Sequence, residues 1–361
     1  VIGFRALDPD RHPRMSNVSG KLRRLDHCHN SRQVGEYPSH AARMVQVSRM
    51  GIGLAAVGRP AYITSNRASD LGSNRTVADM RARTFAVLDA AYAAGMRYVD
   101  AARSYGRAEE FLADWLAAHP QVDDVLIGSK WGYRYIGDWR RDAAVHEVKD
   151  HSLAAFTTQY AETAALLGDR LTVYHVHSAT LETGVLADTG VHEALARLRD
   201  SGVRIGISTS GPAQADAIRR ALEIRVGGTS LFTSLQATWN VLEPSVGPAL
   251  AEAADAGAWV IVKEAVANGR LAPGGVDSPA AQRAARIAAD LGLTVDQLAI
   301  AAALAQPWVT YVLSGAVTPR QVRSNAAAEG VTLPDEIIAE LATLAEEPRA
   351  YWSARAARSW S

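Results

Sequence analysis

The sequence predicts an α/β chain folded as a (β/α)8 TIM barrel. Short apolar runs alternate along it with longer segments whose apolar residues recur at helical spacing. Eight such runs occur, and most lie about 30 residues apart, the length of one βα unit. The runs are apolar over most of their length, as in strands buried on both faces of a parallel sheet. A closed barrel of eight parallel strands accounts for all these features.

The expected strands cover residues 51–55, 97–100, 125–130, 171–177, 203–208, 231–236, 258–263 and 309–314. All but the first end on a polar residue, in the order Asp100, Lys130, His177, Ser208, Gln236, Lys263 and Ser314. Catalytic groups of (β/α)8 barrels come from the carboxyl ends of the strands. These residues are therefore the first candidates for a functional site.

The expected helices cover residues 79–95, 107–118, 145–167, 190–200, 212–223, 246–256, 279–291, 295–305, 319–328 and 334–346. Gly95 fits the end of the first helix, because glycine readily adopts the conformation that ends a helix. Thr318 and Pro319 fit the N-cap and the first turn of a later one. Two steps between strands are longer, because the loops 131–143 and 264–278 are inserted there.

The two ends of the chain differ in character from the barrel. Residues 1–43 are polar and lack sustained periodicity, so we expect a poorly ordered extension followed by one barrel domain over 44–361. The insertion 57–76 and the aromatic tail 351–360 are expected to lie, with the last helix, over the mouth of the barrel.

Composition excludes several classes of protein. Apolar residues make up 48% of the chain, and 38 basic side chains balance 38 acidic ones, so nothing draws it toward nucleic acid or an anionic membrane. The single cysteine, Cys28, excludes an internal disulfide. No run of about 20 apolar residues indicates a transmembrane helix, and no apolar signal region opens the chain. We expect a cytoplasmic enzyme, and the residues indicate no oligomeric state.

An open, doubly wound sheet is the alternative fold. It predicts a glycine-rich phosphate-binding turn after the first strand. The segment Gly51-Ile52-Gly53-Leu54-Ala55-Ala56 lacks the third glycine of that turn, so the barrel is favoured.

Four residues on three successive units suggest proton transfer: Asp100, Tyr105, Lys130 and His177. A tyrosine has an unperturbed pKa of about 10, and a neighbouring ammonium lowers that pKa by stabilising the phenolate. We expect Lys130 to lower the pKa of Tyr105, Asp100 to hold Lys130, and His177 to orient a substrate carbonyl. Only four of the 38 basic residues are lysines, so a lysine at a strand end is conspicuous.

Each of these residues also has a structural interpretation. Asp100 could cap the following helix, Tyr105 could line the barrel mouth, and His177 could be a buried core histidine. We expect His175 to point away from His177. Lys130 is the hardest to explain structurally, because a lone buried ammonium is costly.

The sequence resembles the aldo-keto reductases. The motifs "VDAARSYGRAEEFL", "IGSKWG", "YHVHS", "VRIGIST", "SLQATWN" and "VLSGAVTPRQVRSN" match the family's series in order and spacing, from about residue 50 to 346. The resemblance implies a catalytic tetrad in which Tyr105 is the general acid/base, Lys130 and Asp100 tune it, and His177 positions the carbonyl. It also implies a nicotinamide cofactor bound across the barrel mouth, and an aldehyde, ketone or sugar as substrate.

The resemblance implies a set of cofactor-binding residues as well. Ser208 and Gln236 would hold the nicotinamide carboxamide, with Thr209 standing where the family usually has Asn. Trp239 is the candidate for an aromatic side chain near the nicotinamide. Lys263 is expected near the cofactor phosphates. The segment 314–325 would hold the adenosine phosphate, through Ser314, Gly315, Thr318, Arg320, Gln321 and Asn325.

The same segment bears on the choice between NADP(H) and NAD(H). Many relatives place Lys or Arg directly on the 2′-phosphate, whereas this chain has Gly315, Ala316, Val317 and Gln321 there. Arg320 and Arg323 are close enough in sequence to replace them. We therefore predict NADP(H) as the preferred cofactor, with NAD(H) left open.

Two other functions remain as alternatives to carbonyl reduction. A barrel could bind nucleotide without catalysis, as a regulatory subunit, but such a protein has no need of Tyr105 and Lys130 together. A metal-dependent hydrolase needs clustered His and carboxylate ligands at strand ends, and beyond His175 and His177 no strand-end His supports one. We expect no metal site.

Overall fold

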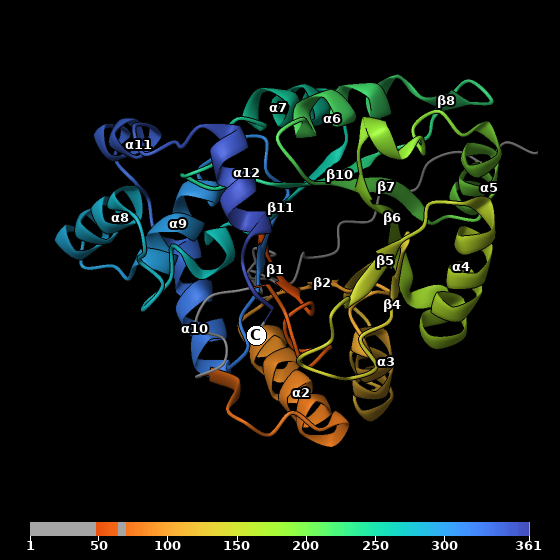
Figure 1. Cartoon of the computed structure of the whole chain (residues 1–361), viewed down its shortest axis with the longest axis horizontal. Coiled ribbons are helices and arrows are strands. Elements are labelled where there is room, and N and C mark those ends of the chain that lie inside the picture. The colour runs from red at the N-terminus through yellow and green to blue at the C-terminus, as the bar shows by residue number, and fades with distance from the viewer. Residues whose placement is uncertain (1–47, 64–69, 361) are drawn as a thin grey trace, which may run out of the picture. The chain divides into compact units, whose positions relative to one another are not determined.

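The computed structural model describes residues 48–63 and 70–360, which belong to one compact unit. Eight parallel strands close into a barrel in the order β1-β12-β11-β10-β7-β6-β3-β2 (Figure 1). They are β1 (Met50–Gly53), β2 (Tyr98–Asp100), β3 (Leu126–Trp131), β6 (Leu171–Ala179), β7 (Arg204–Thr209), β10 (Ser234–Thr238), β11 (Trp259–Lys263) and β12 (Tyr311–Ser314). The predicted barrel and its eight strands are confirmed. The expected extension 1–43 and residues 64–69 of the insertion lie outside the described residues.

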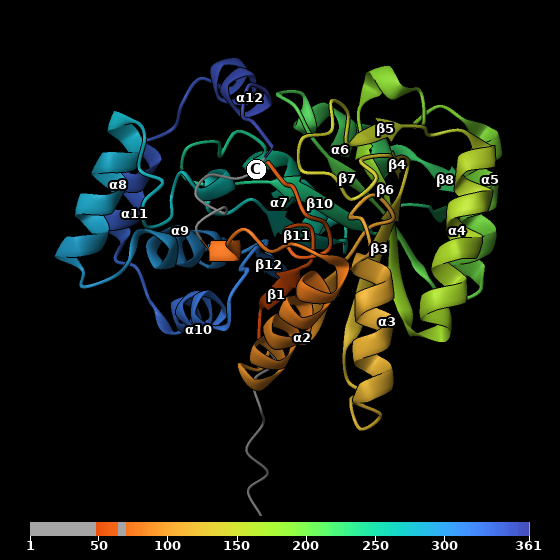
Figure 2. The ribbon, with the colours of Figure 1, turned by 60° about the horizontal axis from the view of Figure 1, so that its bottom comes forward.

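Helices follow the strands and cover the outside of the barrel (Figures 1 and 2). They are α2 (Val77–Ala93), α3 (Ala108–Ala118), α4 (Leu153–Leu167), α5 (Thr189–Asp200), α6 (Gln214–Glu223), α7 (Gly247–Asp255), α8 (Pro279–Asp290), α9 (Val295–Leu304), α10 (Pro319–Ala327), α11 (Asp335–Ala342) and α12 (Pro348–Ala356). Short 3-10 turns cover Gly168–Arg170, Leu181–Thr183, Ala267–Gly269 and Ala328–Gly330.

Capping side chains set where several helices begin. Thr76 and Asp79 form a capping box at the start of α2, and Thr318 accepts the Gln321 N–H at the start of α10. Ser152 caps α4 by accepting the Ala155 N–H, so the expected helix over 145–167 begins only at residue 153. The prediction for 145–152 was wrong because part of that segment is a strand.

That strand is part of a hairpin inserted after β3. β4 (Tyr133–Tyr135) pairs antiparallel with β5 (Glu147–Lys149). A second, smaller hairpin joins β8 (Arg225–Val226) to β9 (Thr229–Ser230). The β4–β5 hairpin places Glu147 against Arg59 and Tyr133 against His177.

The barrel interior is filled by inward-facing side chains from several strands. Tyr98, Val173, Ile261, Tyr311 and Leu313 form a buried cluster there, with the rings of Tyr98 and Tyr311 stacked at 4.8 Å. Two glycines make room for the larger residues. A Cβ on Gly128 would lie 2.2 Å from the Tyr98 hydroxyl, and one on Gly206 would lie 2.5 Å from the His175 ring.

The C-terminal segment returns to the mouth of the barrel. Residues expected only as a tail include a further helix, α12, which Glu347 caps and Pro348 opens. Tyr351 and Trp352 of α12 are buried. The last described residue, Trp360, packs on Arg59 and His146.

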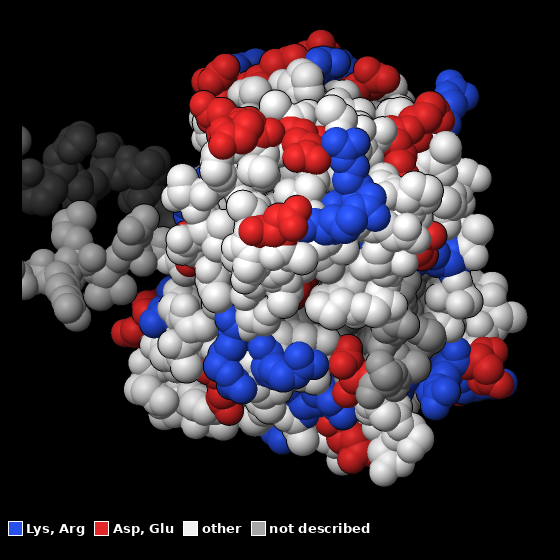
Figure 3. All heavy atoms as spheres, turned by 90° about the vertical axis from the view of Figure 1, so that its left-hand side faces the viewer, with Lys and Arg blue, Asp and Glu red and all other residues white. Residues whose placement is uncertain are grey.

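Charges on one outer face of the barrel are mixed in sign. Acidic and basic side chains are interspersed there with uncharged ones (Figure 3). Arg283 of α8 pairs with Glu340 of α11 at 3.0 Å.

Within the described ranges no single helix is long and apolar enough to cross a membrane. Together α8 and α9 reach that length and composition, but only as a pair bent by 90°.

Candidate active site

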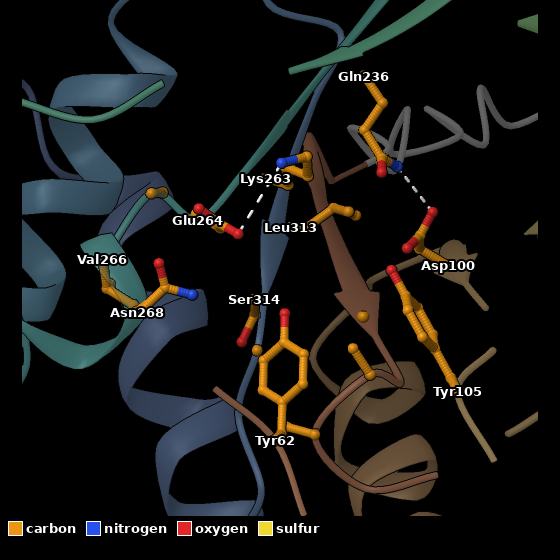
Figure 4. A pocket seen from close by; sticks show the side chains of 15 residues that line it. Tyr62, Asp100, Tyr105, Gln236, Lys263, Glu264, Val266, Asn268, Leu313 and Ser314 are labelled. Carbon is orange, nitrogen blue, oxygen red and sulfur yellow. Dashed lines mark hydrogen bonds and ion pairs between the residues drawn. The ribbon is translucent and has the colours of Figure 1, made fainter. Parts of the chain in front are cut away.

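The carboxyl ends of the barrel strands bring four predicted residues together. Asp100 ends β2, Lys130 is the last residue but one of β3, and His177 lies near the end of β6. Tyr105 follows β2 in the loop that leads to α3. Figure 4 shows the Tyr105 hydroxyl turned toward Asp100, with Gln236 of β10 above it. The convergence expected from strand order is what the structure contains.

Lys130 and Asp100 form a buried ion pair at the base of this group. The Lys130 Nζ donates to Asp100 Oδ2 at 2.5 Å and to the Ala101 carbonyl at 2.8 Å. The other oxygen, Oδ1, accepts from Gln236 Nε2 at 2.8 Å. Because Lys130 is fully buried and Asp100 nearly so, each charge depends on the other for its stabilisation.

A tight turn places Tyr105 above the pair. The Tyr105 N–H donates to the Ala102 carbonyl at 3.0 Å, and Gly106 follows with φ of 64°. A Cβ on Gly106 would lie 2.6 Å from the Gly58 carbonyl oxygen, so the close approach of these two loops requires glycine. The Lys130 Nζ lies 4.8 Å from the centre of the Tyr105 ring.

The expected lowering of the Tyr105 pKa by Lys130 is not found. Burial raises the pKa of Tyr105 well above its usual value, and Asp100 raises it further, while Arg59 lowers it. The physical reason is that Lys130 is bound to the carboxylate of Asp100. The Asp100 carboxylate opposes the effect of the ammonium at the phenol, so burial and Asp100 together decide the direction.

His177 is held as a neutral imidazole. Burial lowers the pKa of His177 well below its usual range, and Lys130 and Arg59 lower it further. Its Nδ1 lies 3.4 Å from the Ser104 hydroxyl. Its ring meets those of Tyr105 and Tyr133 edge to face, at 5.5 and 5.0 Å. With Nδ1 accepting from Ser104, Nε2 would carry the proton and could donate it to a carbonyl.

The expectation that His175 points away from His177 was wrong. Residues two apart on a strand share a face, and both histidines face the barrel interior. His175 Nε2 lies 3.0 Å from the Ser234 hydroxyl of β10, and burial lowers the pKa of His175 to about 3. His175 therefore belongs to the buried interior directly beneath the site.

Beside the tetrad lies a pocket of about 670 Å³. Asp100, Tyr105 and Gln236 line one side of it, and Lys263, Glu264 and Ser314 line the other (Figure 4). Gly315 also lines the pocket. Two buried amide oxygens on its wall, Gln236 Oε1 and Asn268 Oδ1, have no hydrogen-bond partner within 48–63 and 70–360. Unpaired buried acceptors are costly, and a carboxamide N–H is a suitable donor for them. The pocket therefore fits a nicotinamide cofactor.

Lys263 supplies a positive charge on the wall of this pocket. Its Nζ donates to the Thr238 hydroxyl at 2.6 Å and lies 3.9 Å from Glu264 Oε1. Burial lowers the pKa of Lys263 to about 8. Burial disfavours the charged form of the neighbouring Glu264, but Arg355 and Lys263 lower the pKa of Glu264 below its usual range. Arg355 of α12 donates a hydrogen bond to each of the two Glu264 carboxylate oxygens. These bonds connect the C-terminal helix to the wall of the pocket.

Ser208 and Thr209, the other predicted carboxamide ligands, are fully buried at the end of β7. The Ser208 hydroxyl accepts from the Ser178 N–H at 2.8 Å. The Thr209 hydroxyl donates to Gln214 Oε1 at 3.2 Å. Ser208 lies on the inward face, next to Gln236 in the register of β7 and β10. Thr209 faces α6, so the structure does not bring it into the pocket.

The segment expected to bind adenosine phosphate begins at the pocket and runs into α10. Asn325 lies 2.9 Å from the Ser314 hydroxyl. Gln321 Oε1 accepts from the Val317 N–H, and Gln321 Nε2 donates to Asp70 Oδ2 at 2.7 Å. The predicted phosphate ligands Arg320 and Arg323 are exposed. The carboxylate of Asp70 at this position was not foreseen.

Trp239 does not lie near the tetrad. Its ring packs against Trp308 at 5.9 Å and lines a separate groove bounded by α7, α9 and α11. Trp239 is absent from the lining of the pocket beside the tetrad, which includes Lys263 and Glu264.

Sequence reasoning missed several residues around Tyr105. Tyr62, Glu264 and Asn268 line the pocket, and Arg59 contacts Tyr105 from behind. Glu264 and Asn268 have left-handed backbone conformations, with φ of 58° and 54°. Such conformations are uncommon for residues other than glycine and cluster at functional sites. No periodic pattern marks residues of this kind.

Fold and site together are those of a (β/α)8-barrel oxidoreductase. Residues 50–346 match the family model described as "Aldo/keto reductase family". The chain belongs to this family and is an NAD(P)H-dependent oxidoreductase acting on carbonyl compounds. No curated protein matches its sequence.

Solved structures of aldo-keto reductases share the fold. A holo-form enzyme from Bacillus halodurans superposes with a TM-score of 0.61 at 21% identity, covering 83% of this chain and 93% of its own. A structure from Pseudomonas aeruginosa, assigned to the same family, gives 0.55 at 22% identity, covering 78% and 89%. A second structure from that organism gives 0.54 at 23% identity, covering 78% and 90%.

In the part of the chain that the structure describes, no group of three or more His, Cys, Asp or Glu side chains is arranged to hold a metal ion.

Proposed function

We propose that this protein reduces an aldehyde or ketone with NADPH, or runs in reverse as a dehydrogenase of the corresponding alcohol or sugar. The observation that carries the proposal is the meeting of Tyr105, Lys130, Asp100 and His177 at the carboxyl ends of the strands. Asp100 and Tyr105 of this group line a pocket together with Gln236, whose Oε1 is unpaired within the described residues. A proton donor and a cofactor site are thereby adjacent.

Tyr105 would donate the proton. When bound, the nicotinamide cofactor supplies the hydride that reduces the carbonyl carbon. The oxygen that becomes negative then takes the phenolic proton of Tyr105, whose hydroxyl faces the pocket. The Lys130–Asp100 pair and Gln236 are hydrogen-bonded to one another in fixed positions next to the Tyr105 hydroxyl. Little reorganisation of these groups is therefore needed as charge develops on the phenol.

His177 would orient the carbonyl. Its neutral ring can donate one hydrogen bond to the carbonyl oxygen without delivering a full charge. Ser208, Gln236 and Asn268 would hold the carboxamide end of the cofactor, and Lys263 its phosphates. Ser314, Gly315, Thr318, Gln321 and Asn325 would hold the adenosine end, near the N-terminus of α10, where free N–H groups favour anions.

Cofactor oxidation over a panel of aldehydes, ketones and sugars tests the proposal. Turnover of any member, abolished by Tyr105→Phe, supports it. Tight cofactor binding without turnover across the panel would instead support the alternative, a non-catalytic nucleotide-binding barrel. We also propose that the protein is cytoplasmic. Its substrate and its cofactor would both be small molecules.

We expect NADPH to bind more tightly than NADH, by about tenfold to a hundredfold if one arginine reaches the 2′-phosphate. Arg320→Ala and Arg323→Ala, each titrated with both cofactors by fluorescence quenching, identify that arginine. The variant that matters loses NADPH affinity and keeps NADH affinity.

A substitution of Asp70 tests the same prediction in the opposite direction. The Asp70 carboxylate contacts Gln321 and would oppose a phosphate placed there, so Asp70→Asn should raise the affinity for NADPH and leave that for NADH unchanged. Unchanged NADPH-to-NADH ratios in all three variants, or a wild type that prefers NADH, would mean that this segment contains no 2′-phosphate site.

Cofactor affinity should fall as the pH rises through about 8, the pKa of Lys263. A lysine is charged below its pKa and neutral above it, so its attraction for phosphate is lost on the alkaline side. We expect a loss of about tenfold, as for a charge-assisted contact. Titration of NADPH binding from pH 6.5 to 9.5 measures it, about one and a half units either side of that pKa.

Lys263→Met should bind weakly at every pH and remove the dependence. Lys149→Met is the control, because Lys149 donates to the Ser178 carbonyl on the other side of the mouth. If the dependence persists in Lys263→Met, Lys263 does not contact the cofactor phosphates.

A further inference from the structure

Arg59 is an almost fully buried cation directly behind Tyr105. Its side chain is 2% exposed. The Nη1 atom donates to the Ser104 carbonyl at 2.9 Å and to Glu147 Oε2 at 2.8 Å. Burying a guanidinium is costly unless it is paired and hydrogen-bonded. The fold thus binds this charge to the carbonyl group of the peptide bond that joins Ser104 to Tyr105.

Three aromatic rings surround the Arg59 guanidinium. Its central carbon lies 5.2 Å from the centre of the Tyr105 ring, 5.1 Å from that of Tyr62 and 4.7 Å from that of Trp360. These distances are within the range of cation–π attraction. Trp360 in turn stacks on His146 of the hairpin loop at 4.4 Å. Three other segments of the chain, containing Tyr105, Glu147 and Trp360, therefore converge on the loop of Arg59 and Tyr62.

Arg59 and Lys130 act differently on Tyr105. Lys130 is bound to the almost fully buried carboxylate of Asp100, which opposes the charge of Lys130 at the phenol and raises the pKa of Tyr105. The partner of Arg59 is Glu147, whose side chain is 22% exposed and therefore partly solvated. Solvent weakens the opposing field of Glu147 more than that of Asp100.

The charged and titratable groups around Tyr105 come from every element packed on it. They are Asp100 of β2, Lys130 of β3, Glu147 of β5, His177 of β6, and Arg59 and Tyr62 of the loop after β1. Among those that shift its pKa, Arg59 lowers it, whereas Asp100, Tyr62 and Glu147 raise it.

We propose that Arg59 is a positioning residue for proton transfer, which stabilises the phenolate of Tyr105 and fixes its turn through the Ser104 carbonyl. The inference rests on the proposed role of Tyr105 as the proton donor. The proton moves between the Tyr105 oxygen and the substrate oxygen, and Arg59 exchanges none. Arg59 lowers the free energy of the negative charge on the Tyr105 oxygen. That charge is present after Tyr105 has donated its proton in reduction, and before it takes the proton of the alcohol in oxidation.

Oxidation of para-nitrobenzyl alcohol, with reduction of para-nitrobenzaldehyde as the reverse reaction, tests the proposal. Oxidation requires the phenolate, whose fraction falls tenfold for each unit by which the Tyr105 pKa rises. We expect Arg59→Gln to lower kcat for oxidation about tenfold at pH 8, and this difference to shrink only where the pH approaches the raised pKa of Tyr105. Arg59→Lys, which keeps the charge, should stay within about threefold of wild type.

Arg204→Gln is the matched control. Arg204 lies 4.2 Å from the centre of the Trp259 ring and donates to a backbone carbonyl, but at the opposite end of the barrel. It should leave kcat and its pH profile unchanged, whatever it does to thermal stability. Thermal denaturation of each variant separates loss of fold from loss of tuning.

Two results would overturn the inference. One is a kcat for oxidation in Arg59→Gln that equals that of wild type at every pH. The other is Arg59→Lys as impaired as Arg59→Gln. Tyr105→Phe, measured in the same assay, distinguishes the two levels of the argument. If it retains full activity, the proposed function fails; if it is inactive while Arg59→Gln matches wild type, only the role of Arg59 fails.

Discussion

Replacing Tyr105 with Phe is expected to abolish turnover while the cofactor still binds. The ring and its packing against His177 are kept, and only the transferable proton is lost. General acid catalysis contributes about a hundredfold to ten-thousandfold, so kcat should fall by at least about a hundredfold. Steady-state kinetics with the best substrate of the panel, and fluorescence titration of NADPH, measure the two quantities separately.

Tyr98→Phe is a matched control for this change. Tyr98 lies one layer lower in the same barrel, is fully buried, and its hydroxyl has no partner within the described ranges. Removing an unsatisfied buried hydroxyl costs little, so activity should be kept. If Tyr105→Phe retains more than about a tenth of the wild-type rate, Tyr105 is not the proton donor.

Replacing Lys130 with Met should also reduce activity severely, by about a hundredfold. Methionine approximates the volume of the lysine stem but removes the ammonium that donates to Asp100 and to the Ala101 carbonyl. Breaking a buried pair leaves an uncompensated charge and costs about 3–5 kcal/mol of stability. We therefore expect both kcat and the free energy of unfolding to fall, as measured by kinetics and by denaturant titration.

The double variant Asp100→Asn/Lys130→Met separates these two effects. It removes both charges, so stability should recover relative to Lys130→Met while activity stays low. Recovery of activity together with stability would show that Lys130 only maintains the fold. An unchanged rate and pH profile in Lys130→Met would remove Lys130 from the mechanism.

Strand periodicity determined the barrel and half of the site. Asp100, Lys130, His177 and Gln236 could be placed together from sequence, because parallel strands of a closed barrel present their carboxyl ends at one face. The capping pattern at Thr318 and Pro319 was equally local and was confirmed. Periodicity can also be misapplied. His175 was assigned to the wrong face, although the spacing of two residues from His177 already required the same one.

Only the tertiary structure decided the surroundings of Tyr105. The ring of Trp360 reaches Arg59 across nearly the whole chain, Arg355 reaches Glu264, and Asp70 reaches Gln321. These contacts join loops whose paths depend on left-handed residues and inserted hairpins, which have no periodic signature. The direction of the Tyr105 pKa was decided in the same way. The sequence predicted a lowering by Lys130, but the free energy of charging a phenol depends on its burial and on the pairing of Lys130 with Asp100, and both arise only when the chain is folded.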